Sequence, residues 1–318
     1  METRNEEQPL KIRSARAVIA AGFRLYMGNF RRIFRTTWLP ALIGALFTAL
    51  EYYSSIQAIP QLGNLAQAPM AENIMYYLVQ SFISLLSFIV TIVFLSYGFS
   101  MLSRHRAEGA IPYPARWLTA PDGRSLMRTA ATAIVWIVAI GIAAIPPTVV
   151  AAIGLGAKSM TTVGAGMLIA LVMGAFLLPL VYPSMRYCTT RDTRLFDLLG
   201  SGYRQGLRYW GYIFAVLFVM LLIITIILGI TMLPAIVLFI ANMKAQTGAM
   251  MGDPLSMPSY MGWMSFVVFT LSGFIQFYVL MAVLFPAYYM SGSIEQQEIQ
   301  RNEKTKNTLY CPRRHTHP

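Results

Sequence analysis

Residues 217–230 read LFVMLLIITIILGI, a run with no charged side chain and no alternation of polar and apolar positions. Lipid offers the backbone no hydrogen-bond partners, so a membrane-spanning segment must be a helix or a strand of a closed barrel. A barrel strand alternates in polarity over about ten residues. The unbroken apolar run therefore predicts a transmembrane helix.

The same property extends outward along the chain, which is 56% hydrophobic and only 12% charged. A spanning helix needs about 20 largely apolar residues. Six stretches meet this requirement, at about residues 38–59, 74–102, 129–157, 161–185, 211–243 and 262–290. We therefore expect an all-α integral membrane protein with six transmembrane helices. The predicted organisation is a cytoplasmic N-terminus with an amphipathic interfacial helix (residues 1–36), a six-helix transmembrane domain (37–290) and a polar, disordered cytoplasmic tail (291–318).

The basic residues lie almost entirely on one side of these spans. The N-terminal segment, the loops after spans two and four, and the tail hold 23 of the 25 Lys and Arg residues, and the other loops hold only Lys158 and Lys244. Positive loops stay in the cytoplasm, so both termini are expected there, in a bacterial plasma membrane. The net charge of +12 is expected to meet anionic lipid headgroups. No nucleic-acid-binding module is recognisable, so nucleic acid is not an expected partner.

Two recurring patterns suggest an internal threefold repeat. Residues 12–34 place apolar side chains at steps of three and four, which predicts a surface helix in the headgroup plane. Spans two, four and six end alike, with LSYGFSM at 95–101, LVYPSM at 180–185 and FPAYYM at 285–290. The repeating unit would be a surface helix plus a transmembrane hairpin. The alternative is that aromatic belts and basic flanks are general features of membrane proteins.

The N-terminal segment AGFRLYMGNFRRIF, residues 21–34, resembles the opening of a loose group of bacterial six-span proteins. These proteins are related to the membrane domain of glycerophosphoryl diester phosphodiesterases, and the resemblance covers most of the chain. It implies a membrane module without the soluble phosphodiesterase domain. No catalytic residue of that domain can be assigned here.

Candidate functional positions within the spans are few. Glu51 is the clearest ionisable residue in a span, and it suggests either a proton- or cation-coupled role or an interfacial carboxylate that reaches water. Pro146, Pro147 and Pro234 predict kinks or local unwinding in spans three and five. Proline-interrupted helices at matching places in repeats are typical of transporter sites.

Gly166, Ala170 and Gly174 form a stripe of small residues in span four. Such a stripe lets another helix approach closely. Intramolecular packing is the first interpretation. A homo-oligomer seam, or a contact with another membrane protein, is the alternative.

The groups that catalysis or metal binding would need are scarce. The histidines are His105, His315 and His317, all in an inner loop or the tail and without a carboxylate set that would complete a metal site. We therefore predict no catalytic, cofactor-binding or metal-binding residues. The expected function is a non-enzymatic membrane scaffold or permease-like component. The alternatives are a small-molecule or lipid transporter with a site near spans three and five, and a membrane-embedded lipid-modifying enzyme.

Overall fold

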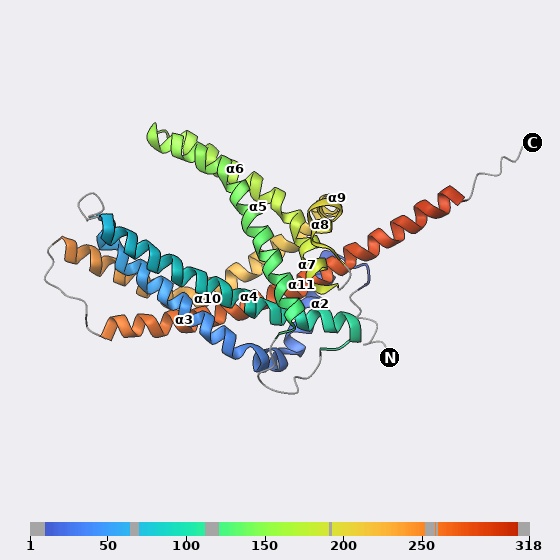
Figure 1. Cartoon of the computed structure of the whole chain (residues 1–318), viewed down its shortest axis with the longest axis horizontal. Helices are drawn as coiled ribbons and strands as arrows, with labels where there is room; N and C mark the ends of the chain where they lie inside the picture. Colours follow the sequence, from blue (N-terminus) through green and yellow to red (C-terminus); the bar gives the residue numbers. More distant parts are fainter. Residues whose placement is uncertain are drawn as a thin grey trace, which may run out of the picture.

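The computed structural model describes residues 10–63, 70–111, 121–190, 193–251, 258 and 260–310. Within these ranges the chain is helical and contains six helices long and apolar enough to cross a membrane, so it is an all-α multi-pass membrane protein (Figure 1). In chain order the elements are α2 (Ala15–Gly28), α3 (Phe30–Gly63), α4 (Met70–Glu108), α5 (Gly123–Gly156), α6 (Met160–Leu177), the 3₁₀ turn η1 (Leu178–Leu180), α7 (Val181–Thr189), α8 (Leu195–Asp197), the π turn η2 (Leu198–Gly202), α9 (Tyr203–Arg208), α10 (Trp210–Met250) and α11 (Tyr260–Tyr310).

The predicted surface helix is present but shorter than the periodicity over residues 12–34 suggested. Helix α2 begins after Ser14, whose Oγ accepts a hydrogen bond from the Ala17 backbone N–H, and it ends at Gly28. Asn29 interrupts it, because the Asn29 side chain donates to the Leu25 carbonyl at 3.0 Å and so caps the last turn. The remaining residues of the pattern form the start of α3. A polar residue that competes for backbone groups thus separates two helices that share one apolar periodicity.

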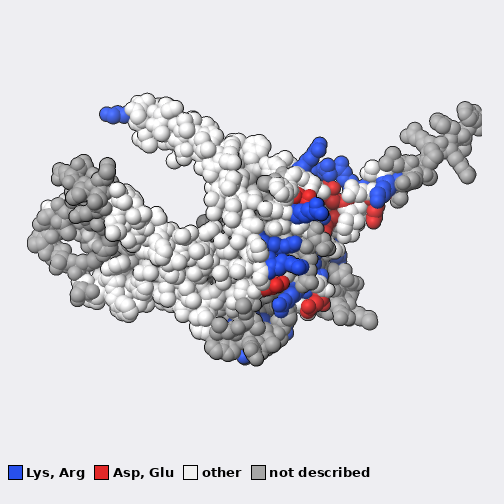
Figure 2. Space-filling view, in the orientation of Figure 1, with Lys and Arg blue, Asp and Glu red and all other residues white. Residues whose placement is uncertain are grey.

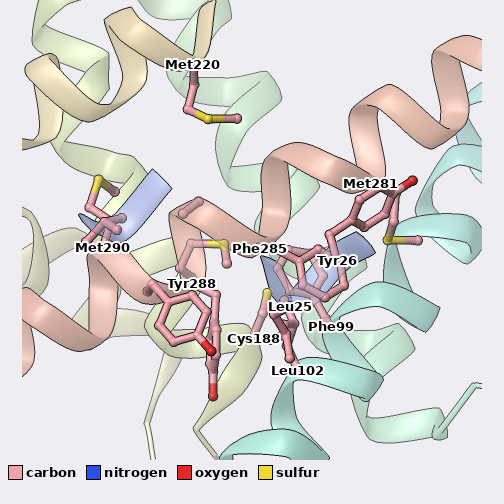
Figure 3. Packing of buried hydrophobic residues seen from close by; sticks show 14 of the residues in the cluster. Leu25, Tyr26, Phe99, Leu102, Cys188, Met220, Met281, Phe285, Tyr288 and Met290 are labelled. Carbon is pink, nitrogen blue, oxygen red and sulfur yellow. The ribbon is translucent and has the colours of Figure 1, made fainter. Parts of the chain in front are cut away.

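Helix α11 is the centre of the packing. The main buried cluster joins its Met281, Phe285 and Tyr288 to residues of α2, α4, α7 and α10 (Figure 3). Tyr26 of α2 packs edge-on against Phe285 with ring centroids 5.3 Å apart, and its hydroxyl donates to the Tyr278 carbonyl at 3.1 Å. The elements that meet here are the ends of the spans that carry the charged residues. The core therefore lies next to the end of the molecule that carries these charged residues.

The expectation of a disordered tail from residue 291 is wrong for residues 291–310, which continue α11 as helix. Ser291, Ser293, Ile294 and Glu298 are buried there. The segment is polar in composition, but residues 291–298 pack against other helices, while residues 299–306 are exposed. Residues 311–318 lie outside the described part of the chain.

Prolines act differently from the expectation. Helix α5 runs through Pro146 and Pro147, and α10 runs through Pro234, so the predicted local unwinding is not found at these three positions. The interruption lies in span four instead. There α6 gives way to η1 at Leu178–Leu180 before α7 resumes.

At the break in span four, side chains from the segment that follows α7 donate hydrogen bonds to the freed backbone carbonyls. Pro179 has no N–H, so the carbonyl four residues earlier, that of Ala175, lacks its helical donor. The indole Nε1 of Trp210 donates to that carbonyl at 3.0 Å, and the Tyr203 hydroxyl donates to the Phe176 carbonyl at 2.9 Å. Gly206 makes this approach possible, because a Cβ there would lie 2.3 Å from the Pro179 carbonyl oxygen. The freed backbone groups are thereby satisfied within the membrane protein.

The α5–α6 hairpin diverges from the bundle formed by α3, α4, α10 and α11 (Figure 1). Helix α6 packs mainly on α5, and Gly166 is its only buried residue among the described ones. Its large apolar side chains, such as Met167, Leu168 and Leu171, are about 70% exposed. A helix that is apolar on all sides needs lipid or protein around it. The exposed faces of the hairpin therefore require lipid or another protein around them.

Charge is segregated along the long axis of the molecule. Figure 2 shows Lys, Arg, Asp and Glu gathered at one end, over the region of α2, α7, α9 and the last part of α11, while the shafts of the helices carry almost none. Lys158, in the turn between α5 and α6, lies at the opposite end. The described parts of the basic segments thus lie at the same end of the molecule. We refer to the basic end as the charged end.

Candidate functional site

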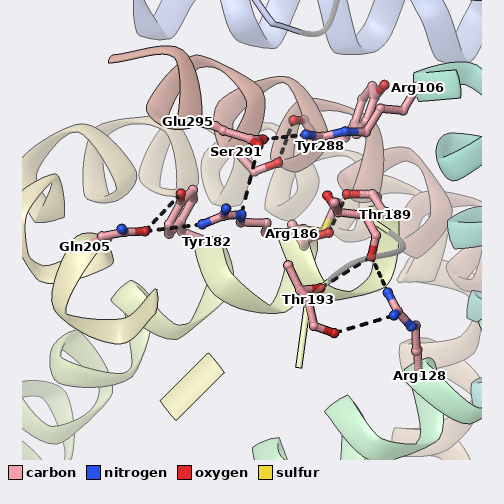
Figure 4. Close-up of polar contacts among 12 residues, drawn as sticks. Arg106, Arg128, Tyr182, Arg186, Thr189, Thr193, Gln205, Tyr288, Ser291 and Glu295 are labelled. Atoms are coloured by element: carbon pink, nitrogen blue, oxygen red, sulfur yellow. Dashed lines mark hydrogen bonds and ion pairs between the residues drawn. The ribbon is translucent and has the colours of Figure 1, made fainter. Parts of the chain in front are cut away.

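A polar network joins the spans at the charged end, and Glu295 is its centre (Figure 4). An Arg106 Nη2 of α4 donates to Glu295 Oε2 at 2.7 Å, and the Arg186 Nε of α7 lies 4.0 Å from Glu295 Oε1. The side chains of Arg106 and Glu295 are only 14% and 15% exposed. One carboxylate of α11 therefore holds the ends of spans two and four.

A second ion pair adds α9 to the network. Arg208, the last residue of α9, donates to both carboxylate oxygens of Glu298, at 2.9 and 3.2 Å. Gln205 of the same helix accepts from the Tyr182 hydroxyl at 3.4 Å and from Arg186 Nη1 at 3.5 Å. Arg186 also faces Glu295, so α9 is linked to Glu298 through Arg208 and to Glu295 through Gln205 and Arg186.

The segment before α2 is tied to the same face of α11. The Arg13 N–H donates to Ser293 Oγ at 3.0 Å, and the Tyr212 hydroxyl of α10 donates to the Arg13 carbonyl at 2.9 Å. The Arg13 guanidinium lies over the Tyr289 ring, 4.9 Å from its centroid. A guanidinium in this position gains a cation–π interaction. Arg13 is thus held by both its backbone and its side chain.

His105 is the only histidine in the described part of the chain, and it is 1% exposed at the end of α4. Its Nδ1 lies 3.1 Å from the Tyr288 hydroxyl. No group of three His, Cys, Asp or Glu side chains that could hold a metal ion occurs among the described residues. His105 is therefore a buried polar partner of Tyr288.

Arg128 of α5 donates hydrogen bonds to the C-terminal end of α7. Its guanidinium donates to the carbonyl of Tyr187 at 2.8 Å and also to the carbonyls of Thr190 and Thr193. The last carbonyls of a helix have no partner within the helix. A cation at that terminus also suits the helix dipole. Arg128 thus binds the end of α7 and also Thr193, which lies shortly before α8.

Burial changes the acidity of tyrosines at the charged end. Burial raises the pKa of Tyr209 above its usual value, and the hydrogen bond to Glu298 raises it further. Burial also raises the pKa of Tyr26. Both phenols therefore stay protonated at neutral pH and act as donors. With arginines that keep their protons and carboxylates that accept from them, the network can hold helices together.

The residues singled out in the sequence lie apart from this network. Glu51 is half-buried in α3, about 30 Å along the helix axis from Phe30. Its backbone carbonyl accepts from Ser54 Oγ at 3.0 Å and Ser55 Oγ at 2.7 Å. Pro234 lies in α10, beside Ala235, which shares a small buried cluster with Ala49 and Phe269. These positions do not converge on a common site.

The small-residue stripe meets one of the prolines. An apolar groove of 420 Å³ between α5 and α6 is lined by Gly166, Ala170, Gly174 and Pro147, among others. A Cβ on Gly166 would lie 3.1 Å from the Pro147 carbonyl oxygen, whereas a Cβ on Gly174 would meet nothing within 4 Å. The stripe therefore packs internally at Gly166 and is open at Gly174.

We predict opposite outcomes for leucine at the two glycines. Gly166→Leu should lower the free energy of unfolding by about 1–3 kcal/mol, because it overpacks the α5–α6 contact. Gly174→Leu should change it by less than about 0.5 kcal/mol, as expected for open positions. Thermal unfolding in detergent measures both. Loss of cross-links between protomers in Gly174→Leu would instead support the homo-oligomer seam.

Sequence reasoning missed the centre of the network. Glu295 and Glu298 were placed in a disordered tail, and Arg106 and Arg186 in loops. The signal that was available is the pattern of Ile294, Glu295 and Glu298, with spacings that suit one side of a helix continuing from span six. The chain has only 13 acidic residues against 25 basic ones, and two of the 13, Glu295 and Glu298, lie close together here. Their proximity also points to ion pairing.

A comparison with known proteins found no matching protein-family model, curated protein or solved structure.

Proposed function

We propose that the protein is a non-enzymatic component of the bacterial plasma membrane, a scaffold or permease-like protein. Its charged end faces the cytoplasm and contacts anionic lipid headgroups. The observation that carries this proposal is the segregation of charge at one end of six apolar helices (Figure 2). Cytoplasmic segments of membrane proteins are rich in Lys and Arg. The proposal also agrees with the membrane-module role implied by the resemblance to phosphodiesterase membrane domains.

The chemistry of the network favours a non-enzymatic role. Glu295 and Glu298 are both engaged by arginines, so neither is poised as a general base. Arginine itself stays protonated in proteins, so it is not a general base either. What the network supplies is a set of ion pairs that hold the helix ends together. The exposed basic residues outside it, such as Arg16 and Arg31, are suited to binding an anionic surface.

One cavity favours the lipid-transporter alternative. A space of 370 Å³ lies between α4, α5, α7 and α11, and its wall includes Phe88, Thr132, Trp136 and Ser184. The polar atoms in that wall bond within the protein, as when Trp136 Nε1 donates to Ser184 Oγ at 3.1 Å. Its lining therefore suits an acyl chain better than a polar solute.

The two proline-bearing spans, α5 and α10, have different neighbours. Helix α5 packs on α4, α6 and α7, whereas α10 packs on α11, α3 and α2.

Cysteine labelling tests the proposed orientation. In a Cys311→Ser background, we expect a membrane-impermeant maleimide to label Lys158→Cys from outside intact cells. Arg301→Cys, on the exposed part of α11 at the charged end, should be labelled only after the membrane is opened. Labelling of Arg301→Cys in intact cells would refute the cytoplasmic assignment.

Lipid scrambling separates the scaffold from the transporter. Vesicles containing the purified protein should move labelled phosphatidylglycerol between leaflets no faster than protein-free vesicles. Faster movement that is lost in Ala133→Phe, which places a ring in the α4–α5 cavity, would favour the transporter. Ala170→Phe, which enters the separate α5–α6 groove, is the matched control.

A further inference from the structure

A hollow at the start of α2 combines space with concentrated positive charge. The cavity measures 360 Å³ and is lined by the segment that enters α2 and by one face of that helix. Lys11, Arg13 and Arg24 contribute three cationic side chains, and no acidic side chain is among its described lining residues. The cavity is therefore an open space with basic side chains on several sides.

The hollow exists because the α2 face beneath it is made of small side chains. Ala17, Ala20 and Ala21 line it between the basic residues. The opposite face of α2 carries Val18, Ile19, Leu25 and Tyr26, which are buried in the core. Helix α2 is therefore held from one side, and the alanine face stays open at the surface.

One of the three cations is fixed in advance. The backbone of Arg13 bonds to Ser293 and Tyr212, and its guanidinium lies over the Tyr289 ring. Lys11 and Arg24 are exposed and lie on either side of it along the chain. A group that is already ordered loses little freedom on binding a ligand, so its contribution to affinity is larger.

The face continues from the cavity into an apolar surface. Met27 follows Arg24 by three residues, on the same side of α2, and it is 69% exposed. Phe30 at the start of α3 is 38% exposed. A ligand that carries a phosphate next to a hydrocarbon chain would meet both kinds of surface in the right order. Free phosphate would use only the basic part.

We propose that this cavity binds the phosphodiester headgroup of an anionic membrane lipid, with Lys11, Arg13 and Arg24 around the phosphate. The site rests on the proposed function, because it requires the charged end to face an anionic leaflet. It deepens that function by naming one specific headgroup site. Most of the basic surface would contribute only diffuse attraction.

Lipid titration with matched charge variants tests the site. Full-length protein in detergent is titrated with phosphatidylglycerol or with phosphatidylcholine, and bound lipid is counted by native mass spectrometry. Each basic residue near an anionic surface contributes about fivefold in affinity, so Lys11→Gln/Arg24→Gln should weaken phosphatidylglycerol binding about 25-fold. Arg16→Gln/Arg31→Gln removes two exposed charges of the same region that do not line the cavity, and it should weaken binding less than about threefold.

A variant that fills the hollow separates shape from charge. Ala17→Leu/Ala20→Leu keeps all three cations and should weaken phosphatidylglycerol binding at least about tenfold, because the side chains occupy the space. Both alanines are exposed, so folding should be preserved, and the thermal unfolding midpoint verifies this. Unchanged binding in this folded variant would overturn the cavity as the site.

The remaining outcomes distinguish the site from the function and the lipid from its phosphate. Equal losses in the two charge variants, with wild type still preferring phosphatidylglycerol, would overturn the site and leave the proposed function standing. No preference of the wild type for phosphatidylglycerol over phosphatidylcholine would overturn both. Inorganic phosphate is titrated in parallel. Binding as tight as that of phosphatidylglycerol would show that the ligand is a soluble anion and overturn the lipid assignment.

Discussion

Replacing Glu295 with Gln is expected to lower the free energy of unfolding by about 3 kcal/mol, the low end of the range for removing one partner of a buried ion pair. The substitution leaves the guanidinium of Arg106 mostly buried without its carboxylate, at a side-chain exposure of 14%. It also removes the negative charge beside Arg186. The expected loss is large because Glu295 holds α4 and α7 together through α11. The midpoint of thermal unfolding in detergent measures it.

Glu298→Gln is the matched control, since it removes a carboxylate three residues away on the same helix. Its partner Arg208 is 42% exposed and can be solvated by water, so the expected loss is about 1 kcal/mol or less. The double variant Arg106→Gln/Glu295→Gln should recover part of the stability lost in Glu295→Gln, because no uncompensated Arg106 charge remains. Equal losses for Glu295→Gln and Glu298→Gln would contradict the central role given to Glu295.

The spans could be predicted from the sequence because their cause is local. Each run of about 20 apolar residues by itself indicates a helix in lipid, and the structure contains six such helices in its described part. The start of α2 was also accessible, since the periodicity near Ser14 is a property of neighbouring residues. The end of α2 was not, because Asn29 fits either the interior of a polar helix face or a cap, and only the geometry at Leu25 decides.

The predicted unwinding at Pro146, Pro147 and Pro234 is absent, whereas the break in span four, which depends on distant residues, was not predicted. Pro147 and Pro179 carry the same backbone restriction, yet α5 continues through the first and α6 ends before the second. At Pro179 the released carbonyl receives a donor from Trp210, which is 35 residues away. No local pattern near residue 179 announces that donor.

The network at the charged end was missed for the same reason. Arg106 and Glu295 are separated by 189 positions, and their pairing exists only once α4 and α11 are packed. In the sequence, residues 291–310 are polar enough to suggest a tail. Residues 291–298 nevertheless pack against other elements, among which α11 contacts α2 and α7, and composition does not reveal these contacts. The distribution of basic residues along the sequence predicted the charged end, but it did not predict which charges are paired.

Gly22→Ala is expected to be the most damaging single methyl in α2. A Cβ at this position would lie 2.4 Å from the backbone nitrogen of Pro286 and 2.6 Å from its Cα. Backbone atoms cannot move aside as a side-chain end can, so α2 must shift away from α11. Overpacking of this kind costs about 1–3 kcal/mol and occasionally more. The upper part of that range is expected, because Tyr26 and Phe285 pack on the same contact.

Gly28→Ala supplies the control on the same helix, because a Cβ there would meet nothing within 4 Å. Alanine also favours helix over glycine by up to about 1 kcal/mol, so Gly28→Ala should be neutral or slightly stabilising. Hydrogen exchange adds a local readout. In Gly22→Ala the amides of α2 should exchange faster while those of α10 keep their protection, since α2 detaches from α11 before the bundle opens. If Gly22→Ala matches Gly28→Ala in stability and exchange, then α2 does not dock on Pro286, and the rigid seat of the lipid cavity would be lost with it.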